Sequence, residues 1–273
     1  MYQHYYGLTK MPFNTTPDTR FFFHSEQHQE ALSSLIYAIS ERKGFVLLTG
    51  EIGAGKTTIC RALLNRLDPN TKVAVITNTR LTGKQLLQTI CEEFNLWIPG
   101  NVGKVTLFSE LNSFLVDQYR MGANVVLVID EAQNLRPDVL EEVRLISNLE
   151  TERDKLLQII LMGQPELRDI VDLPELKQLK QRIVLRFHLY PLTDKEAKDY
   201  IFHRLKVAGA TGQLKFTRNA LKSIYSYSGG IPRVINIICD NALLLGFVRE
   251  TKKISEDIIA EVVTDLECAR AES

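Results

Sequence analysis

The stretch GEIGAGKTT, Gly50–Thr58, carries glycines, a lysine and a threonine at the spacing G-x-x-x-x-G-K-[ST]. The apolar run GFVLLT (44–49) precedes it, and the amphipathic segment TTICRALLNRL (57–67) follows it. Such a loop folds around phosphate groups when a strand comes before it and a helix comes after it. The stretch therefore predicts a phosphate-binding loop, and with it a fold in which strands and helices alternate.

Each residue type in this loop has a chemical reason to be there. Gly53 and Gly55 let the backbone N–H groups turn toward phosphate oxygens, assisted by the N-terminus of the following helix. Lys56 brings positive charge to the β- and γ-phosphates, and the Thr57 hydroxyl is a ligand for Mg²⁺. A glycine-rich turn that matches by chance is the alternative. The predicted ATP-binding residues are Gly50, Glu51, Gly53, Ala54, Gly55, Lys56, Thr57 and Thr58.

Two acids close a second apolar run in VVLVIDEAQ (125–133). Asp130 falls at the carboxyl end of a predicted strand, where α/β sheets collect their ligands, and it is the second predicted Mg²⁺ ligand. Glu131 is placed to orient or deprotonate an attacking water. A strand that merely ends in two acids is the alternative. Together with the upstream loop, the pair predicts hydrolysis of ATP.

The wider pattern predicts an α/β fold with a five-stranded parallel sheet. Continuous rather than alternating apolarity indicates strands covered on both faces, as in a parallel sheet flanked by helices. The five runs are GFVLLT (44–49), VAVIT (73–77), VVLVI (125–129), LQIILM (157–162) and VLRFHL (184–189).

After about Leu192 the pattern becomes helical only. Helix start signals are the capping box formed by Thr193 and Glu196, and then Thr217, Pro232 and Ser255. We expect an all-helical lid domain at 192–273 and a P-loop core at 44–191. The N-terminal aromatic segment and first helix, 1–43, are expected to be part of the ATPase domain.

Composition sets broad limits on the function. The 273 residues include 33 Lys+Arg and 33 Asp+Glu, so the formal net charge is zero and nothing global indicates nucleic-acid binding. The four cysteines form no C-x-x-C pair, which predicts reduced thiols. The N-terminus lacks a signal-peptide layout, and no run reaches the roughly 18 apolar residues of a membrane helix. We expect a soluble, cytoplasmic protein.

The N-terminal segment is dense in aromatic residues, and two interpretations of it stay open. It could wrap the sheet domain and pack under the adenine, with Pro12 and Phe13 lining the base pocket. It could instead form a partner-docking or base-stacking surface. The first is favoured because apolar rings without adjacent basic residues usually enter cores. His24 and His28 are four apart but have no third ligand nearby, so capping or packing is favoured over metal binding.

Several of these motifs together resemble those of a known ATPase family. The phosphate-binding loop, the DE pair, the polar end of the next strand, an arginine before the fifth strand and GIPR (230–233) together resemble the AAA+ ATPases. More narrowly, the chain resembles the ExeA-like general secretion pathway protein A ATPases. That resemblance extends to about residue 267 and rests on the opening segment 5–39, IDEAQNL (129–135), RLISNLET (144–151) and LMGQPEL (161–167).

The resemblance implies three further roles. Arg182, or Arg186 nearby, would act in trans on the γ-phosphate held by a neighbouring subunit. Arg233 would act in cis and couple the lid to the nucleotide. Gln164 would be the polar sensor near the γ-phosphate and the attacking water, one position later than the shorter sensor residue expected at Gly163. A Gln164 that only ends its strand is the alternative.

For the whole chain, the resemblance implies an ATP-dependent homo-oligomer at the cytoplasmic face of the inner membrane. It would drive or regulate assembly of a bacterial envelope system, meaning secretion, a pilus or exopolysaccharide. The alternative is a DNA-associated AAA+ regulator of the transposition target-selection type, which neutral charge disfavours. A scaffold that binds nucleotide without hydrolysis is disfavoured because Lys56, Thr57, Asp130 and Glu131 are all present.

Overall fold

The computed structural model describes residues 2–98, 100, 102–152 and 154–271. Its backbone contacts divide the chain into two compact units. The sheet unit comprises Gln29–Gly50 and Ile59–Leu189. The lid unit comprises the chain up to His28, the loop Glu51–Thr58 and the chain from Tyr190 onward.

The sheet unit is built on five parallel strands in the order β2-β3-β4-β1-β5. Their bounds are β1 Phe45–Gly50, β2 Lys72–Ile76, β3 Val125–Ile129, β4 Gln158–Gly163 and β5 Ile183–Leu189. This confirms the predicted fold class, and β4 lies between β1 and β3. Because every neighbouring pair is parallel, the carboxyl ends of the strands share one edge of the sheet.

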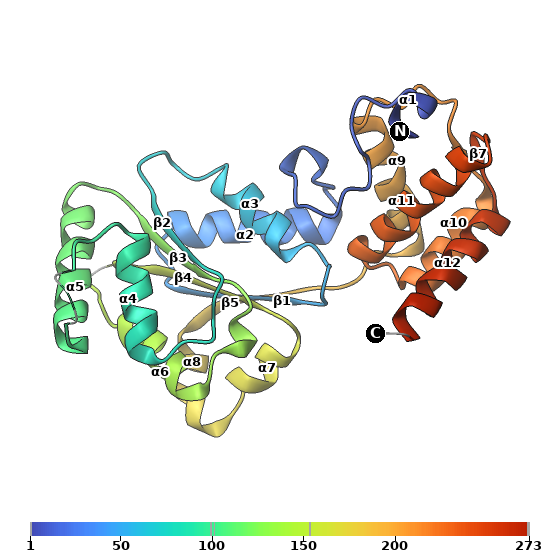
Figure 1. Ribbon diagram of the computed structural model, residues 1–273. Coiled ribbons are helices and arrows are strands. Elements are labelled where there is room, and N and C mark those ends of the chain that lie inside the picture. The colour runs from blue at the N-terminus through green and yellow to red at the C-terminus, as the bar shows by residue number, and fades with distance from the viewer. Residues whose placement is uncertain (1, 99, 101, 153, 272–273) are drawn as a thin grey trace. The chain divides into compact units, whose positions relative to one another are not determined.

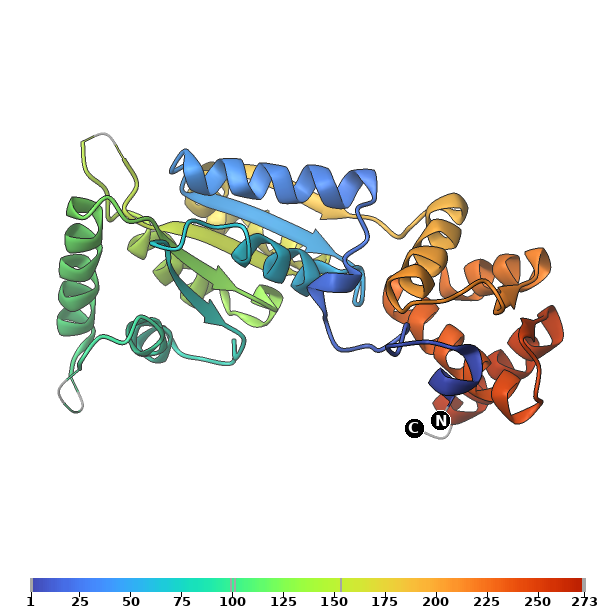
Figure 2. The same cartoon turned by 90° about the horizontal axis from the view of Figure 1, so that it is seen from above.

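Helices cover both faces of this sheet (Figure 1). Alternate strand residues such as Leu47, Leu127 and Leu161 pack in one core with α4 to α8. On the other face lie α2 and α3, which cover the strands in the view from above (Figure 2). This double cover explains why the strands are apolar without interruption. The helices are α2 Glu26–Ser40, α3 Lys56–Leu64, α4 Gly83–Glu93, α5 Lys104–Arg120, α6 Pro137–Ile146, α7 Glu166–Val171 and α8 Lys177–Arg182.

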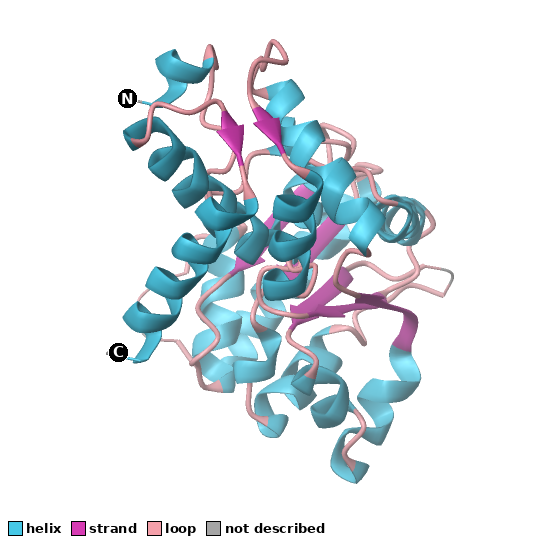
Figure 3. Ribbon diagram, turned by 90° about the vertical axis from the view of Figure 1, so that its right-hand side faces the viewer, coloured by secondary structure: helices cyan, strands magenta, loops and turns pink. Residues whose placement is uncertain are grey.

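The lid unit contains four longer helices beside a two-stranded parallel sheet (Figure 3). The predicted starts of two helices are confirmed, because the Thr193 hydroxyl accepts from the Glu196 N–H in a capping box and Thr217 caps α10. The short sheet was not predicted. The elements are α9 Asp194–Val207, β6 Lys215–Phe216, α10 Arg218–Ser228, α11 Pro232–Val248, β7 Lys253–Ile254 and α12 Glu256–Ala271.

The N-terminal segment differs from expectation. Its rings do enter a core, but that core is the one of the lid helices, so the prediction that the segment wraps the sheet domain is wrong. The segment forms α1, Tyr2–Tyr6, and the 3₁₀ turn η1, Thr19–Phe21. Within it, the Tyr6 hydroxyl lies 3.1 Å from the carbonyl oxygens of both Leu243 and Thr251. The expected grouping of 1–43 with the ATPase core therefore differs from the structure, where the chain up to His28 belongs to the lid unit.

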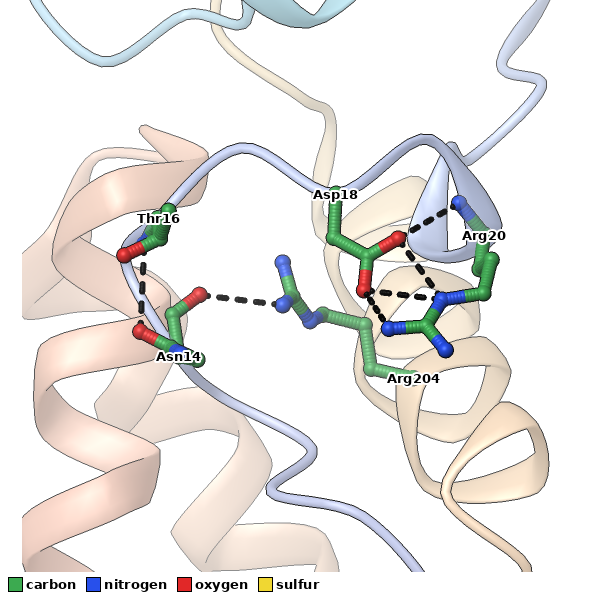
Figure 4. Close-up of polar contacts among 5 residues, drawn as sticks. All are labelled: Asn14, Thr16, Asp18, Arg20 and Arg204. Carbon is green, nitrogen blue, oxygen red and sulfur yellow. Dashed lines mark hydrogen bonds and ion pairs between the residues drawn. The ribbon is translucent and has the colours of Figure 1, made fainter.

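Arg204 of α9 ties this segment down. Its Nε donates to the Pro12 carbonyl at 2.5 Å. Its Nη2 donates to the Asn14 carbonyl at 3.1 Å, as Figure 4 shows. The guanidinium also lies 4.8 Å from the centre of the Phe21 ring, which adds a cation–π contact. Phe13 is 1% exposed inside the lid core, so the expected base-pocket role of its ring is not supported.

Two other expectations concern the whole chain. The cysteines are all free, and Cys60, Cys91 and Cys239 are buried. Burial raises the pKa of the Cys60 thiol to about 12, so this side chain stays protonated and unreactive. Among the helices of the described residues, none combines the length and the apolar character that crossing a membrane requires.

Candidate active site

The phosphate-binding loop leaves β1 at Gly50 and enters α3 at Lys56. Gly53 and Gly55 have φ values of 83° and 106°, the left-handed region that favours glycine, so both glycines are required by the backbone. Lys56 is only 6% exposed, and its Nζ donates to the Glu51 carbonyl across the loop at 3.0 Å. Thr57 is exposed in the first turn of α3. The loop thus has the shape and the donors that a phosphate group requires.

Arg233, predicted to couple the lid to the nucleotide, lies against this loop within the lid unit. Its backbone N–H donates to the Gly53 carbonyl at 3.3 Å. A Cβ on Gly53 would come within 2.4 Å of the Arg233 Cβ, so only glycine allows this approach. The structure therefore brings the first turn of α11 to the glycine-rich loop.

His28 contacts the loop from another side, which the sequence did not predict. Its Nε2 lies 3.0 Å from the Ala54 carbonyl oxygen and its Nδ1 lies 2.6 Å from the Ser25 hydroxyl. Because a carbonyl can only accept, Nε2 carries the hydrogen and Nδ1 accepts from Ser25. Burial lowers the pKa of His28, which favours this neutral form. A Cβ on Gly55 would lie 3.0 Å from Nε2, so the ring fills space that this glycine leaves.

The acidic pair lies at the carboxyl end of β3 in the sheet unit. Asp130 is 8% exposed, and its Oδ1 accepts the Glu131 N–H at 2.9 Å. Glu131 has φ 53° and ψ 38°, a left-handed conformation that costs a non-glycine residue about 1–3 kcal/mol. The Thr79 hydroxyl donates to the Glu131 carbonyl at 3.1 Å and helps to hold it. Strained residues of this kind cluster at functional sites.

Two amides converge on the Glu131 carboxylate. Gln133 Nε2 donates to Glu131 Oε2 at 2.6 Å, and Gln164 Nε2 reaches the same oxygen at 3.3 Å. Gln164, predicted from the sequence as the polar end of β4, is therefore brought to the predicted catalytic acid. The sequence analysis did not single out Gln133. Its position two residues after Glu131 was the signal that could have indicated it.

Arg182 lies at the amino end of β5, whereas Gly50 lies at the carboxyl end of the neighbouring strand β1. This arginine ends α8 directly before β5, and its Nη1 lies 3.5 Å from the Ser147 hydroxyl. Along β5, Ile183 pairs with Phe45 and Leu189 pairs with Gly50. Seven residues at about 3.3 Å each separate Arg182 from the level of Gly50 by roughly 20 Å, farther than an arginine side chain extends.

Arg186, the other candidate, lies in β5 and belongs to an exposed network with Asp172, which follows α7, and Lys180 of α8. It contacts the Asp172 carboxylate at 3.5 Å and the Lys180 carbonyl at 3.4 Å. Lys180 also pairs with Asp172 at 2.9 Å. Hydrogen bonds from Lys180 and then from Arg186 lower the pKa of the Asp172 carboxyl. Arg186 is thus held by an acidic side chain and a carbonyl, whereas the contact given above for Arg182 is one long hydrogen bond to the Ser147 hydroxyl.

The described residues contain no group of three or more His, Cys, Asp and Glu side chains that could hold a metal ion. That excludes a site of this kind built by the described part of the chain alone. Mg²⁺ is commonly held by one or two protein oxygens and completes its shell with phosphates and water. Thr57 and Asp130 remain the ligands that the sequence predicts for it.

Comparisons with known proteins agree with this geometry. Residues 39–171 match the family model described as AAA domain. Over 254 residues the chain is 45% identical to general secretion pathway protein A of Aeromonas hydrophila. The match covers 93% of this chain and 46% of that protein, so the chain spans about half the length of this relative.

Solved structures share the fold at low identity. Cdc6p from Pyrobaculum aerophilum superposes with a TM-score of 0.68 at 18% identity, covering 89% of this chain and 67% of that one. The Aeropyrum pernix ORC1 protein, solved in complex with DNA, gives 0.68 at 18% identity and covers 94% and 70%. The Thermotoga maritima RuvB Holliday junction branch migration motor gives 0.59 at 21% identity and covers 90% and 70%. These likenesses establish the fold.

Proposed function

We propose that this chain, an AAA+ ATPase related to general secretion pathway protein A, hydrolyses ATP to drive or regulate assembly of a bacterial envelope system. The observation that carries the catalytic part is the Glu131 carboxylate at the carboxyl end of β3, held by amide groups on a strained backbone. A carboxylate fixed in this way suits a group that must orient one water molecule.

In this proposal the loop residues hold the triphosphate. The backbone N–H groups of Gly50, Glu51 and Gly53 to Thr58 bind phosphate oxygens, and Lys56 places its charge at the β- and γ-phosphates. Lys56 Nζ has three donors, so it can keep its contact with the Glu51 carbonyl while it donates to phosphate oxygens. Thr57 and Asp130 would supply protein oxygens to Mg²⁺, which when bound would neutralise charge on the phosphates.

Hydrolysis then needs one water and one base. Glu131 accepts a proton as the water oxygen bonds to the γ-phosphorus and the bond to the β,γ-bridging oxygen breaks. ADP and phosphate leave, and Glu131 returns its proton to solvent. Gln164, which reaches the same carboxylate, is the proposed sensor of the γ-phosphate.

The two arginines act from different places. Arg233 couples the lid to the nucleotide in cis, which its contact with Gly53 supports. Arg182 acts in trans on the nucleotide of a neighbouring copy, since in its own chain it lies at the amino end of β5. The active form in this proposal is therefore an ATP-dependent homo-oligomer.

The partner class rests on the relative, whose name places it in a general secretion pathway. Since it is 45% identical over most of this chain, we propose an envelope or secretion-system partner at the cytoplasmic face of the inner membrane. The DNA-associated alternative is supported by the DNA-bound ORC1 structure through fold alone. Zero formal net charge weighs against it.

Lys56→Ala and Glu131→Gln test the catalytic assignment. We expect Glu131→Gln to keep ATP affinity and lose at least about a hundredfold in kcat, because the base is gone but the loop is intact. Lys56→Ala should weaken ATP binding itself. Equal hydrolysis by wild type and Glu131→Gln would overturn the assignment of the base.

The partner assignment needs a separate measurement. ATPase rates are compared with no addition, with purified inner-membrane vesicles and with duplex DNA, each at low and at moderate salt. Stimulation by the vesicles supports the envelope role. If DNA stimulates the ATPase and the vesicles do not, and if the stimulation falls steeply with salt, the DNA-associated function is the correct one.

A further inference from the structure

We propose that Gln133 is a positioning residue for hydrolysis. It holds one oxygen of the Glu131 carboxylate and thereby leaves the other oxygen available to the attacking water. This inference rests on the proposed function, since it concerns the same acid. Gln133 lies on the 3₁₀ turn η2, Ala132–Asn134, directly after Glu131.

The orientation of the Gln133 amide follows from its partners. Its Oε1 accepts the backbone N–H of Gln164 at 3.1 Å. A backbone N–H can only donate, so the oxygen end of the amide must face β4. The NH₂ end must then face Glu131, where Nε2 donates to Oε2 at 2.6 Å. Gln133 therefore connects the ends of two neighbouring strands through one rigid amide.

This contact distinguishes the two oxygens of Glu131. Oε2 accepts from Gln133 at 2.6 Å and from Gln164 at 3.3 Å, and the shorter bond assigns the main holding role to Gln133. Among the contacts of the described residues, Oε1 of Glu131 accepts no hydrogen bond. Oε1 is consequently the oxygen left for water, while Oε2 is occupied by protein donors. In a glutamate side chain without these contacts, rotation about the terminal bonds would exchange the two oxygens, so neither would be reserved for water.

Gly163 makes the arrangement possible. A Cβ at this position would lie 2.7 Å from Gln133 Oε1 and 2.7 Å from Leu167 Cδ2. Real Cβ atoms do not approach so closely, so any larger residue at 163 would displace the amide. Position 163 therefore requires glycine, because a side chain there would occupy the space that the Gln133 amide fills at the end of β4.

Gln133→Met tests the inference, because it keeps the length of the side chain and removes both amide contacts. We expect kcat to fall about ten- to a hundredfold, the value of a hydrogen bond to a charged group, while the affinity for ATP stays unchanged. Gln133→Glu keeps an acceptor for the Gln164 N–H but turns a second carboxylate toward Glu131. It should lower kcat further than Gln133→Met does.

Gln88→Met is the matched control. Gln88 Nε2 donates to Glu92 Oε1 at 2.9 Å on the exposed surface of α4, so it forms the same type of pair away from the site. Its kcat should equal that of the wild type. Thermal unfolding of each variant shows that the fold is retained.

Three results would overturn the inference. One is a Gln133→Met enzyme with wild-type kcat, and another is a loss in kcat matched by an equal loss in ATP affinity. The third is a full additional loss when Gln133→Met is combined with Glu131→Gln, because a residue that acts only through Glu131 should add little once that acid is gone. Absence of ATP hydrolysis by the wild type is distinguishable from all three and would remove the proposed function itself.

Discussion

At the scale of single residues, side chains from outside the GEIGAGKTT stretch occupy the space that its glycines leave. Arg233 lies over Gly53, and His28 lies over Gly55 and bonds to the Ala54 carbonyl. The motif glycines therefore do two things at once. They allow the left-handed turns of the loop, and they admit neighbours that a Cβ would exclude.

The buried His28 predicts a pH dependence of stability. Burial lowers its pKa in the folded state, so the unfolded chain binds more protons below its ordinary pKa of about 6.5. Stability should thus be lost as pH falls from about 6.5 toward the lowered value, by at most about 1.4 kcal/mol per pH unit from this group. Urea denaturation at pH 7.5, 6.5 and 5.5 measures the effect.

His28→Gln isolates this contribution, since the amide keeps a donor for the Ala54 carbonyl but does not titrate. The variant should show a flatter dependence of stability on pH than the wild type. His4→Gln, at an exposed position of α1, is the matched variant for the loss of one histidine. An unaltered slope in His28→Gln would exclude the histidine as its source.

At the scale of elements, the N-terminal segment belongs to the lid because its rings complete the lid core. Tyr2, Tyr6, Phe13 and Phe21 are each buried among lid helices. Arg204 adds hydrogen bonds to two carbonyls of the segment, which no other donor of α9 supplies in the contacts described above. The segment thus completes a small helical domain that would otherwise expose apolar surface.

Arg204→Met should detach the segment. The Pro12 and Asn14 carbonyls would lose charge-assisted hydrogen bonds, and we expect the lid to lose about 3 kcal/mol of stability. Urea midpoints and the rate of proteolytic cleavage within residues 8–25 measure this. Arg20→Met is the control, because Arg20 is exposed and its ion pair with half-buried Asp18 lies within the same segment (Figure 4). Equal cleavage rates in the two variants would contradict the anchoring role of Arg204.

At the scale of the whole molecule, Arg182 lies where the strands of the sheet begin. The acids lie where the strands end, and the carboxyl end of β1 continues into the phosphate-binding loop. A single copy cannot bring Arg182 to the end of its own β1 across the length of β5. Under the proposed function, each complete site then needs residues of two copies.

Mixing inactive variants tests this directly. Arg182→Ala lacks the arginine and Lys56→Ala lacks the loop lysine, and each alone should be nearly inactive. In a mixture, some sites combine an intact loop from one copy with an intact arginine from the other, so ATPase activity should return in part. A mixture as inactive as its components, at concentrations where the wild type is oligomeric, would refute action in trans.

Much of this architecture could be predicted because it depends on local patterns. Uninterrupted apolar runs mark strands covered on both faces, and capping residues such as Thr193 and Thr217 mark helix starts. The roles predicted for Lys56 and the DE pair rest on residue type and spacing alone. The placement of the N-terminal segment could not be predicted, since aromatic rings indicate burial but not the core that receives them.

The sequence by itself determined the fold class, the glycine-rich loop between a strand and a helix, the acid pair at the end of β3 and the polar residue at the tip of β4. Only the tertiary structure decided that Gln133 and Gln164 share Glu131, that His28 and Arg233 fill the space over the loop glycines, and that the opening segment belongs to the lid. The physical reason is the range of the interactions. Backbone turns and apolar periodicity are encoded by neighbours in the chain, whereas amide contacts between strands and side chains over glycines depend on residues far apart in sequence, which only the folded chain brings together.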